Sequence, residues 1–163
     1  MKNIMLLGTL LVSTFSFSQE VRLGYLHGFG TDYTNASNGA FIELDRIGFQ
    51  VDTGVYITQE AYEINYTADM ESFDDWTPGG SFTRIGAFTT IPLKHSPLDL
   101  KLGIGTMISE GYTLTGIKSQ NSMYFQAGVN INTYSDTIIT INYVNSPKGN
   151  ANTILVGAAF RIF

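Results

Sequence analysis

The sequence contains no cysteine, little proline and few charged residues. Without cysteine, the 163-residue chain has no disulfide framework, no thiolate metal site and no lipoprotein anchor. Charged residues make up 14% of the chain, compared with about 25% in typical soluble domains. Acidic residues outnumber basic residues by 14 to 9, which argues against a nucleic-acid-binding surface. The length fits a single domain.

Long hydrophobic runs are also missing from most of the chain. After residue 20, every apolar run is interrupted within a few residues by Gly, Thr, Asn or a charged residue. A transmembrane helix needs about 20 consecutive, mainly apolar residues. If this part of the chain crosses a membrane, it therefore does so as a closed β-barrel, in which the backbone polar groups are paired between strands.

The first 18 residues differ from the rest of the chain. Lys2 is followed by the apolar stretch Ile4–Val12 and then by small and aromatic residues that end at Ser18. A charged start, an apolar run of fewer than about 15 residues and small residues before the cut are features of a secretory signal peptide. The stretch is too short for an uncleaved membrane helix. We predict that residues 1–18 are removed during export and that residues 19–163 form the mature domain.

From residue 20 onward, apolar and polar residues alternate with a period of two, which is the pattern of β-strands. In Leu98–Met107, for example, Leu and Ile occupy most even positions, and Asp, Lys and Gly occupy most odd positions. Breaks in the alternation divide the chain into eight expected strands, at about 20–30, 38–46, 48–66, 80–93, 97–108, 121–132, 137–145 and 153–163.

The connections between these strands alternate in length. Long connections are expected at 31–38, 68–79 and 109–120, an intermediate one at 146–152, and short ones at 94–96 and 133–136. The turn between the second and third strands lies either at Asp45–Gly48 or at Asp52–Gly54. Long connections at one end and short connections at the other are typical of up-and-down antiparallel barrels. The predicted fold is all-β, an eight-stranded antiparallel up-and-down β-barrel.

The polar faces of the expected strands carry few charges, and this decides which solvent surrounds the barrel. A water-soluble exterior needs roughly 25–35% charged residues, whereas these faces are rich in Gly, Thr, Asn and Gln. We therefore expect apolar residues to face lipid and polar residues to face the lumen, as in transmembrane β-barrels. Aromatic residues recur near the strand ends, as they do at lipid–water boundaries; they are Phe29, Tyr33, Tyr56, Tyr62, Tyr66, Trp76, Tyr112, Tyr134 and Tyr143.

Charged residues on the polar faces are candidates for the lumen. Eight strands enclose only enough space for side chains. We therefore expect these residues to form a network of ion pairs and hydrogen bonds that fills the barrel and leaves no wide pore. They are Arg22, Arg84, Asp99, Lys101 and Arg161.

With its export signal, its alternating segments and its final strand ending at Phe163, the chain resembles small outer-membrane β-barrel proteins of the OmpX/OmpA type. It is most similar to the group found in Bacteroidetes-like bacteria, and the resemblance covers nearly the whole mature chain. Segments 49–56 and 98–105 look like strands of that group, and the first favours the turn at Asp45–Gly48.

The resemblance implies a bacterial outer-membrane location, contact with outer-membrane lipid, and a structural or surface-interaction role. In this family the barrel-insertion machinery recognises a C-terminal aromatic residue. Phe163 matches that position, with Phe160, Ala158 and Val156 as supporting residues of the last strand.

Residues that could support catalysis or metal binding are few. The imidazoles are His27, in the first expected strand, and His95, in a short turn, and no Gly-x-Ser-x-Gly elbow accompanies them. The acidic residues Asp69, Glu71 and Asp74–Asp75 match no EF-hand spacing, so we interpret them as a solvated exterior loop. We expect no catalysis, no cofactor and no bound metal.

Two alternative functions remain open from the sequence. The first is a soluble exported barrel of the lipocalin type that binds a small apolar ligand inside. The second is a membrane barrel enzyme that modifies envelope lipids through His27. The direction of the apolar side chains separates the first alternative from the transmembrane barrel, because a lipocalin turns its apolar face inward.

Overall fold

The computed structural model describes residues 20–30, 36–56, 79–113, 116–133, 136–146 and 152–162. The predicted signal peptide 1–18, the acidic residues Asp69, Glu71, Asp74 and Asp75, and Phe163 lie outside the described residues. No helix in this part of the chain is long and apolar enough to cross a membrane.

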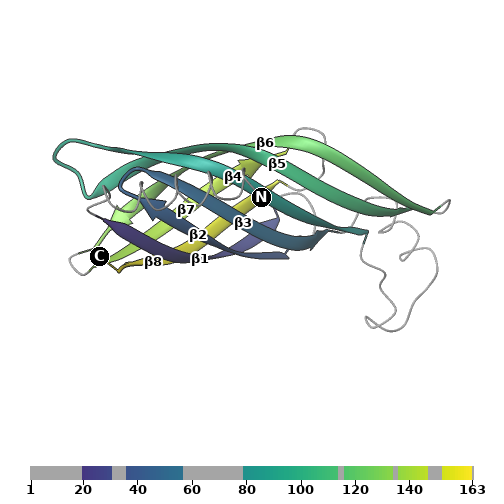
Figure 1. The fold of residues 1–163 in the computed structure, drawn as a ribbon, viewed down its shortest axis with the longest axis horizontal. Helices are drawn as coiled ribbons and strands as arrows, with labels where there is room; N and C mark the ends of the chain where they lie inside the picture. Colours follow the sequence, from purple (N-terminus) through teal and green to yellow (C-terminus); the bar gives the residue numbers. More distant parts are fainter. Residues whose placement is uncertain are drawn as a thin grey trace, which may run out of the picture.

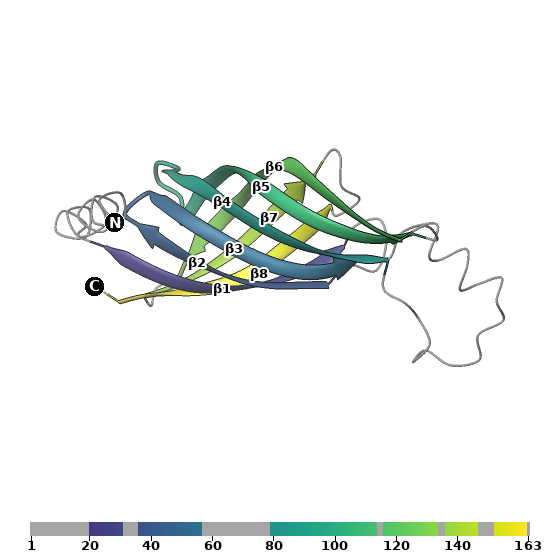
Figure 2. The same ribbon diagram turned by 45° about the vertical axis from the view of Figure 1, so that its right-hand side comes forward.

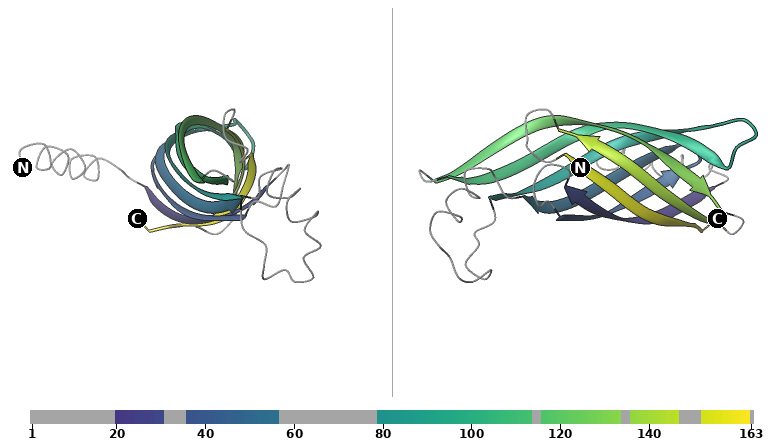
Figure 3. Two further views of the ribbon diagram at one scale, coloured as in Figure 1. Left: turned by 90° about the vertical axis from the view of Figure 1, so that its right-hand side faces the viewer. Right: turned by 180° about the vertical axis from the view of Figure 1, so that it is seen from behind.

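The described residues form a closed antiparallel barrel in which each strand pairs with the next and the last strand pairs with the first (Figure 1). Seen from one end, the strands form a ring (Figure 3, left). This confirms the predicted fold class. The strands are β1 (Val21–Gly30), β2 (Ala36–Leu44), β3 (Ile47–Tyr56), β4 (Gly80–Pro92), β5 (Leu98–Thr113), β6 (Gly116–Asn132), β7 (Thr137–Asn145) and β8 (Thr153–Arg161).

The turn between β2 and β3 consists of Asp45 and Arg46, since Leu44 pairs with Ile47. Asp45 has a φ of 55°, a left-handed conformation that aspartate tolerates better than most residues. The Asp45 amide donates to the Glu20 carbonyl at 3.0 Å. Of the two positions considered from the sequence, Asp45–Gly48 is therefore correct, and Asp52 and Thr53 lie within β3.

The prediction of a long connection at 109–120 is wrong. β5 and β6 instead continue as a paired hairpin up to Thr113 and Gly116. Figure 1 shows these two strands reaching further than their neighbours at the right-hand end. The outer part of this hairpin carries polar residues such as Glu110, Ser119 and Gln120, which are exposed. A ribbon with water on both faces needs no apolar alternation, so its sequence carries no strand pattern.

The outer wall of the barrel is apolar. Phe125 is 52% exposed, Ile141 39% and Val156 38%, although each is a large hydrophobic residue in mid-strand. Their neighbours in sequence on β6 and β7, Gln126 and Asn142, are buried inside. Apolar residues therefore face outward and polar residues inward, as predicted for a transmembrane barrel. This arrangement contradicts the lipocalin-type alternative, which needs an apolar interior.

The interior is more apolar than the sequence analysis predicted. Tyr56, expected at a lipid–water boundary, instead points inward and is buried. A narrow barrel must be filled completely by side chains, and large apolar residues fill space without needing partners. The buried hydrophobic set consists of Leu26, Phe41, Tyr56, Phe82, Phe88, Met107, Tyr124, Ile138, Val144, Leu155 and Ala159.

Glycines on the inner face make room for two of these rings. A Cβ on Gly24 would lie 2.2 Å from the Phe41 ring, and one on Gly48 would lie 2.1 Å from the Phe88 ring. In each case the glycine and the phenylalanine are direct cross-strand partners. Each ring therefore occupies the space that a side chain of its partner would need.

If the apolar wall faces lipid, a charged residue on it must lower the free energy of unfolding more than a charged residue on the outer part of the β5–β6 hairpin. We expect Ile141→Arg, in mid-strand, to lower the free energy of unfolding by about 2–4 kcal/mol. The matched control is Ile117→Arg, because Ile117 lies near the hairpin tip and is 67% exposed. This control should have little effect. Equilibrium unfolding from lipid vesicles measures both values, and equal effects would contradict the lipid-facing wall.

Candidate functional site

The two ends of the barrel differ in structure. At the turn end lie the turns 45–46 and 93–97, together with Glu20, Asp136 and Ile162. At the loop end, the strands lead into residues 31–35, 57–78, 114–115 and 147–151. Charged side chains occupy the lumen in separate layers between these ends.

The layer nearer the loop end is a buried ion pair between β3 and β4. The Arg84 guanidinium donates to Asp52 Oδ2 from Nε at 2.9 Å and from Nη2 at 2.5 Å. Its Nη1 donates to Thr153 Oγ1 at 3.1 Å, which connects the pair to β8. The guanidinium carbon lies 4.6 Å from the centre of the Phe82 ring. Arg84 and Asp52 are both fully buried, and the hydrogen bond from Arg84 to Thr153 links this pair of neighbouring strands to the opposite side of the barrel.

The next layer holds Lys101 between two aromatic rings. Its Nζ lies 3.8 Å from the centre of the Phe88 ring and 4.4 Å from that of the Phe41 ring. The two rings meet edge to face, with centroids 5.7 Å apart. Lys101 is fully buried, and cation–π attraction stabilises a desolvated ammonium in such a position.

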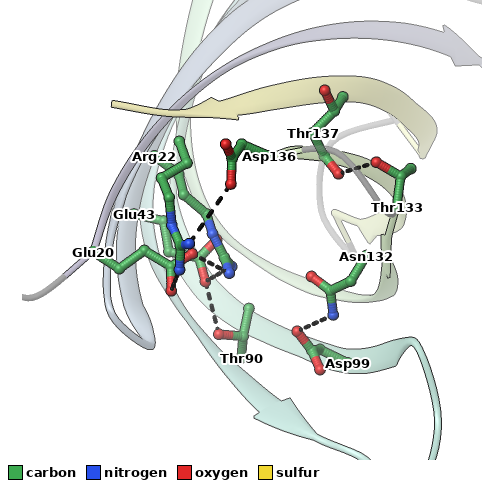
Figure 4. A network of polar contacts seen from close by, with 10 residues as sticks. Glu20, Arg22, Glu43, Thr90, Asp99, Asn132, Thr133, Asp136 and Thr137 are labelled. Carbon is green, nitrogen blue, oxygen red and sulfur yellow. Dashed lines mark hydrogen bonds and ion pairs between the residues drawn. The ribbon is translucent and has the colours of Figure 1, made fainter. Parts of the chain in front are cut away.

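At the turn end, Glu20 connects the first and last strands (Figure 4). It forms ion pairs with Arg22 of β1 and with Arg161 of β8, the latter at 2.8 Å. Arg161 also lies 3.6 Å from Asp136, and its side chain is 46% exposed. Burial raises the pKa of Glu20, but the hydrogen bond and charge of Arg161 and the charge of Arg22 outweigh it, so the pKa is lowered.

Two further contacts complete the turn-end network (Figure 4). Glu43 is buried and accepts a hydrogen bond from Thr90 Oγ1 at 2.8 Å, while Arg22 lies 3.4 Å from the same carboxylate oxygen. Asp99 accepts a hydrogen bond from Asn132 Nδ2 at 2.9 Å. These contacts connect β2 to β4 and β5 to β6 across the opening of the barrel.

The five charged residues predicted for the lumen thus occupy three places rather than one network. Arg84 and Lys101 are buried in successive layers of the interior. Arg22 and Asp99 lie half-buried at the turn end. Arg161 lies at the rim, where it contacts Glu20 and Asp136.

The acidic partners of the arginines were missed in the sequence analysis. Asp52 and Glu43 are the partners of Arg84 and Arg22. Both have the inward parity of their strands, shared with Gln50 and Phe41 respectively. The sequence shows this parity, but Asp52 also fits the alternative turn Asp52–Gly54, which conceals its place in a strand. Glu20 precedes β1 and has no strand parity to reveal it.

His27 lies on the outer wall, in phase with Tyr25 and Phe29. Its Nδ1 is 2.8 Å from Asn38 Oδ1, and its ring meets the Phe29 ring edge to face. Neither contact brings a nucleophile to the imidazole. Within the described ranges, no group of three or more His, Cys, Asp or Glu side chains is placed to hold a metal ion.

The buried pair between Asp52 and Arg84 generates a stability prediction. We expect Asp52→Ala to lower the free energy of unfolding by about 3–5 kcal/mol, because it removes the buried carboxylate that is paired with the Arg84 guanidinium. The double variant Asp52→Leu/Arg84→Met should recover most of the loss. Unfolding in detergent micelles measures both. A double variant as unstable as Asp52→Ala would show that the pair itself, rather than the remaining charge of Arg84, determines stability.

The turn-end ion pairs generate a pH prediction. The pKa of Glu20 in the folded barrel is below its ordinary value of 4.5. Its stabilising contribution is therefore complete above that value and is lost as the pH falls through the lowered pKa. Wild type should exceed Glu20→Gln in stability at neutral pH, and the difference should shrink on acidification. Glu110→Gln, exposed and at the other end, is the control and should show no such change.

Comparisons with known proteins add the fold but no family assignment. No protein-family model matches the chain. No curated protein matches it in sequence.

Solved structures of similar fold are outer-membrane barrels. The chain resembles Yersinia pestis Ail in a phospholipid nanodisc, with a TM-score of 0.59 and 12% identity over 88% of this chain and 99% of Ail. A crystal structure of Ail gives a TM-score of 0.52 and 15% identity, over 88% and 97% of the two chains. The N-terminal barrel of Pseudomonas aeruginosa OprF gives 0.54 and 12%, over 89% of this chain and 98% of that domain. This chain is therefore an eight-stranded β-barrel with the fold of small outer-membrane proteins.

Proposed function

We propose that the chain is an integral protein of a bacterial outer membrane that presents a rigid strand edge to partners outside the cell. The apolar wall supports insertion into lipid, since the exposed side chains in mid-strand are mainly Leu, Ile, Val and Phe. In this proposal the turn end faces the periplasm and the loop end faces outward.

Export and insertion form part of the same proposal. Residues 1–18 act as a cleaved signal peptide, on the sequence pattern described above. β8 carries the signal for the barrel-insertion machinery. The outward position of Val156 and Phe160 supports this role, because both side chains stay exposed on the outer face of β8. Ala158 lies between them and is half-buried. Phe163, the terminal aromatic residue, lies outside the described residues.

The lumen has a structural role in this proposal. Arg84 and Lys101, with their aromatic and acidic partners, fill the barrel, while Arg22, Asp99 and Arg161 tie its turn end together. The full burial of Arg84, Phe82, Lys101 and Tyr124 supports a barrel without a wide pore. The contacts of His27 support a barrel without catalysis, since they are Asn38 and Phe29 among the described residues.

The observation that carries the interaction role is an open strand edge on the outer hairpin. β6 pairs with β5 from Gly116 to Ile131 but with β7 only from Phe125 to Asn132. Between Gly116 and Tyr124, no strand of the described chain pairs with the second edge of β6. An unpaired edge is a template on which an extended peptide adds as a new strand.

The direction of the backbone groups along β6 identifies the open donors. The Asn132 amide donates to the Pro97 carbonyl, and the Gln120 carbonyl accepts a hydrogen bond from Ser109 Oγ. Even-numbered residues of β6 thus direct their backbone groups toward β5. Because these groups alternate between neighbours in an antiparallel ladder, the odd-numbered residues direct theirs to the open edge. On the outer hairpin these residues are Ile117, Ser119 and Asn121.

The hairpin also offers a side-chain contact. Ile117 is 67% exposed, the highest value among the large exposed hydrophobic residues of the described chain. Along β6, Ser119 and Asn121 separate Ile117 from the apolar wall. Ile117 therefore provides an apolar anchor next to the open edge. One barrel of similar fold, Ail, is named an attachment invasion locus protein, which is consistent with an adhesive role for this chain.

Proline at Ser119 tests this function, because it removes an open-edge donor and leaves the ladder to β5 intact. The probe is a phage-displayed library of nonapeptides, selected on the wild-type barrel in nanodiscs. Selected peptides should bind Ser119→Pro about tenfold more weakly, because the variant lacks one main-chain hydrogen bond and because the proline ring keeps the peptide away from the edge. Ser119→Ala keeps the amide and should bind like wild type.

Amide hydrogen exchange on the free barrel provides the control for this experiment. The amides of Ser119 and Asn121 should exchange much faster than those of Gln120 and Ser122, which face β5. Equal protection of all four amides would show that the edge is covered in the free protein. Equal binding of the selected peptides to Ser119→Pro would exclude strand addition at this edge.

A further inference from the structure

Three polar side chains gather on the outer wall where β1 pairs with β2. The Tyr25 hydroxyl donates to Asn38 Oδ1 at 2.5 Å, and His27 Nδ1 lies 2.8 Å from the same oxygen. His27 and Asn38 are direct cross-strand partners, and all three residues have outward parity. Asn38 and Tyr25 are exposed. The cluster thus belongs to the surface of the barrel and not to its lumen.

The cluster lies within the apolar band and not above it. On β1, the exposed apolar residues Leu23 and Phe29 lie on the two sides of the cluster along the strand. On β8, Ile154 and Val156 are paired with Phe29 and His27, and both are exposed. Phe29 and Ile154 extend the apolar wall beyond the cluster toward the loop end, so apolar side chains flank these polar groups on both sides along the wall. Polar groups in hydrocarbon are costly unless they are paired.

The hydrogen bonds within the cluster leave one donor and one acceptor without a partner among the described residues. Asn38 Oδ1 receives both hydrogen bonds, so the Nδ2 group of Asn38 remains available as a donor. With Nδ1 donating to Asn38, Nε2 is the ring nitrogen of His27 that is left to accept a hydrogen bond.

The nearby threonines of the same wall differ in this respect. Thr53 pairs with Asn38 in the ladder, and its hydroxyl donates to the Phe82 carbonyl at 3.0 Å. The Thr83 hydroxyl in turn donates to Thr53 Oγ1 at 3.4 Å. These two hydroxyl groups are satisfied within the wall itself. Among the polar side chains of this cluster and its two threonine neighbours, the unmet hydrogen-bonding capacity is therefore that of His27 and Asn38.

We propose that a second copy of this chain covers this face, in a two-fold symmetric contact between β1–β2 walls. A donor and an acceptor on one surface become self-complementary under a two-fold axis, since each copy supplies what the other lacks. Asn38 Nδ2 of one copy then donates to His27 Nε2 of the other, and the reverse. Ala36 and Ala40, which flank Asn38 on the outward face of β2, leave room for the close approach of a second wall.

Other occupants of the membrane fit this face less well. Acyl chains offer no hydrogen-bonding groups. A lipid head group would have to reach the cluster past Phe29 and Ile154, which continue the apolar wall beyond it. The inference rests on the membrane location proposed above but not on the open edge of β6, which lies at a different part of the barrel.

Cysteine cross-linking in membranes tests the contact, because the chain has no native cysteine. Ala40→Cys places a thiol on the outward face of β2, next to Asn38 and near the proposed two-fold axis. Oxidation should convert most of this variant into a disulfide-linked dimer. Ala127→Cys, exposed on β6 away from this face, is the matched control and should stay monomeric. Equal cross-linking of the two variants would overturn the proposal.

Substitution of His27 and Asn38 tests whether their hydrogen bonds cause the association of the two copies. In an Ala40→Cys background, His27→Leu/Asn38→Leu should lower the association constant about five- to tenfold. This is the effect of losing two intermolecular hydrogen bonds of the strength that is usual within membranes. Thr53→Val/Thr83→Val removes polar groups of the same wall that are already satisfied, and should not change association. Undiminished dimerisation of the leucine variant would overturn the proposal. Membrane fractionation and heat-modifiable migration verify that each variant is an inserted barrel, so failure of the membrane location would be recognised separately.

Discussion

Closure of the barrel is the constraint on which the rest of the structure depends. In hydrocarbon every backbone amide and carbonyl must be paired, and the pairing of β8 with β1, from Arg22 with Arg161 to Gly30 with Thr153, closes the ring and leaves the outer part of β6 as its open edge. Glu20 continues this closure beyond the ladder, because it forms ion pairs with Arg22 and Arg161. With eight strands the closed ring is narrow, and buried side chains such as Phe82, Arg84 and Tyr124 fill its described interior. The interactions proposed for this chain therefore lie on the outside of the barrel.

The alternation of residues is sufficient to predict much of this architecture. Five of the eight strands, namely β1, β2, β4, β7 and β8, were expected close to their observed bounds, because lipid on one side and a packed lumen on the other impose a strict period of two. The outward direction of Phe125, Ile141 and Val156 follows from the scarcity of charge on the opposite face. In these segments the alternation in the sequence follows directly from the two environments on either side of the wall. The hairpin lacks that boundary, so β5 and β6 were predicted too short.

The arrangement inside the lumen could not be predicted in the same way. Parity places Arg84 and Lys101 inside, but it does not reveal that Arg84 pairs with Asp52 while Lys101 lies between Phe41 and Phe88. Those partners come from strands whose relative stagger is set by the closed ring. The position of Arg161 at the rim depends likewise on where β8 ends relative to Glu20 and Asp136. Local sequence decides which face a side chain occupies, and the shear of the barrel decides its neighbours.

The match between inward glycines and aromatic rings has a consequence for how such a chain can evolve. Gly24 and Phe41 form one unit, and Gly48 and Phe88 form another, in which a missing side chain and a large one share a single space. A larger residue at either glycine would collide with its ring, and a smaller residue at either phenylalanine would leave a void beside an empty position. Neither member can therefore drift alone. Related sequences that depart from this pattern should change both members of a unit together, so these paired positions would covary across homologues more strongly than positions on the lipid-facing wall, where side chains vary independently.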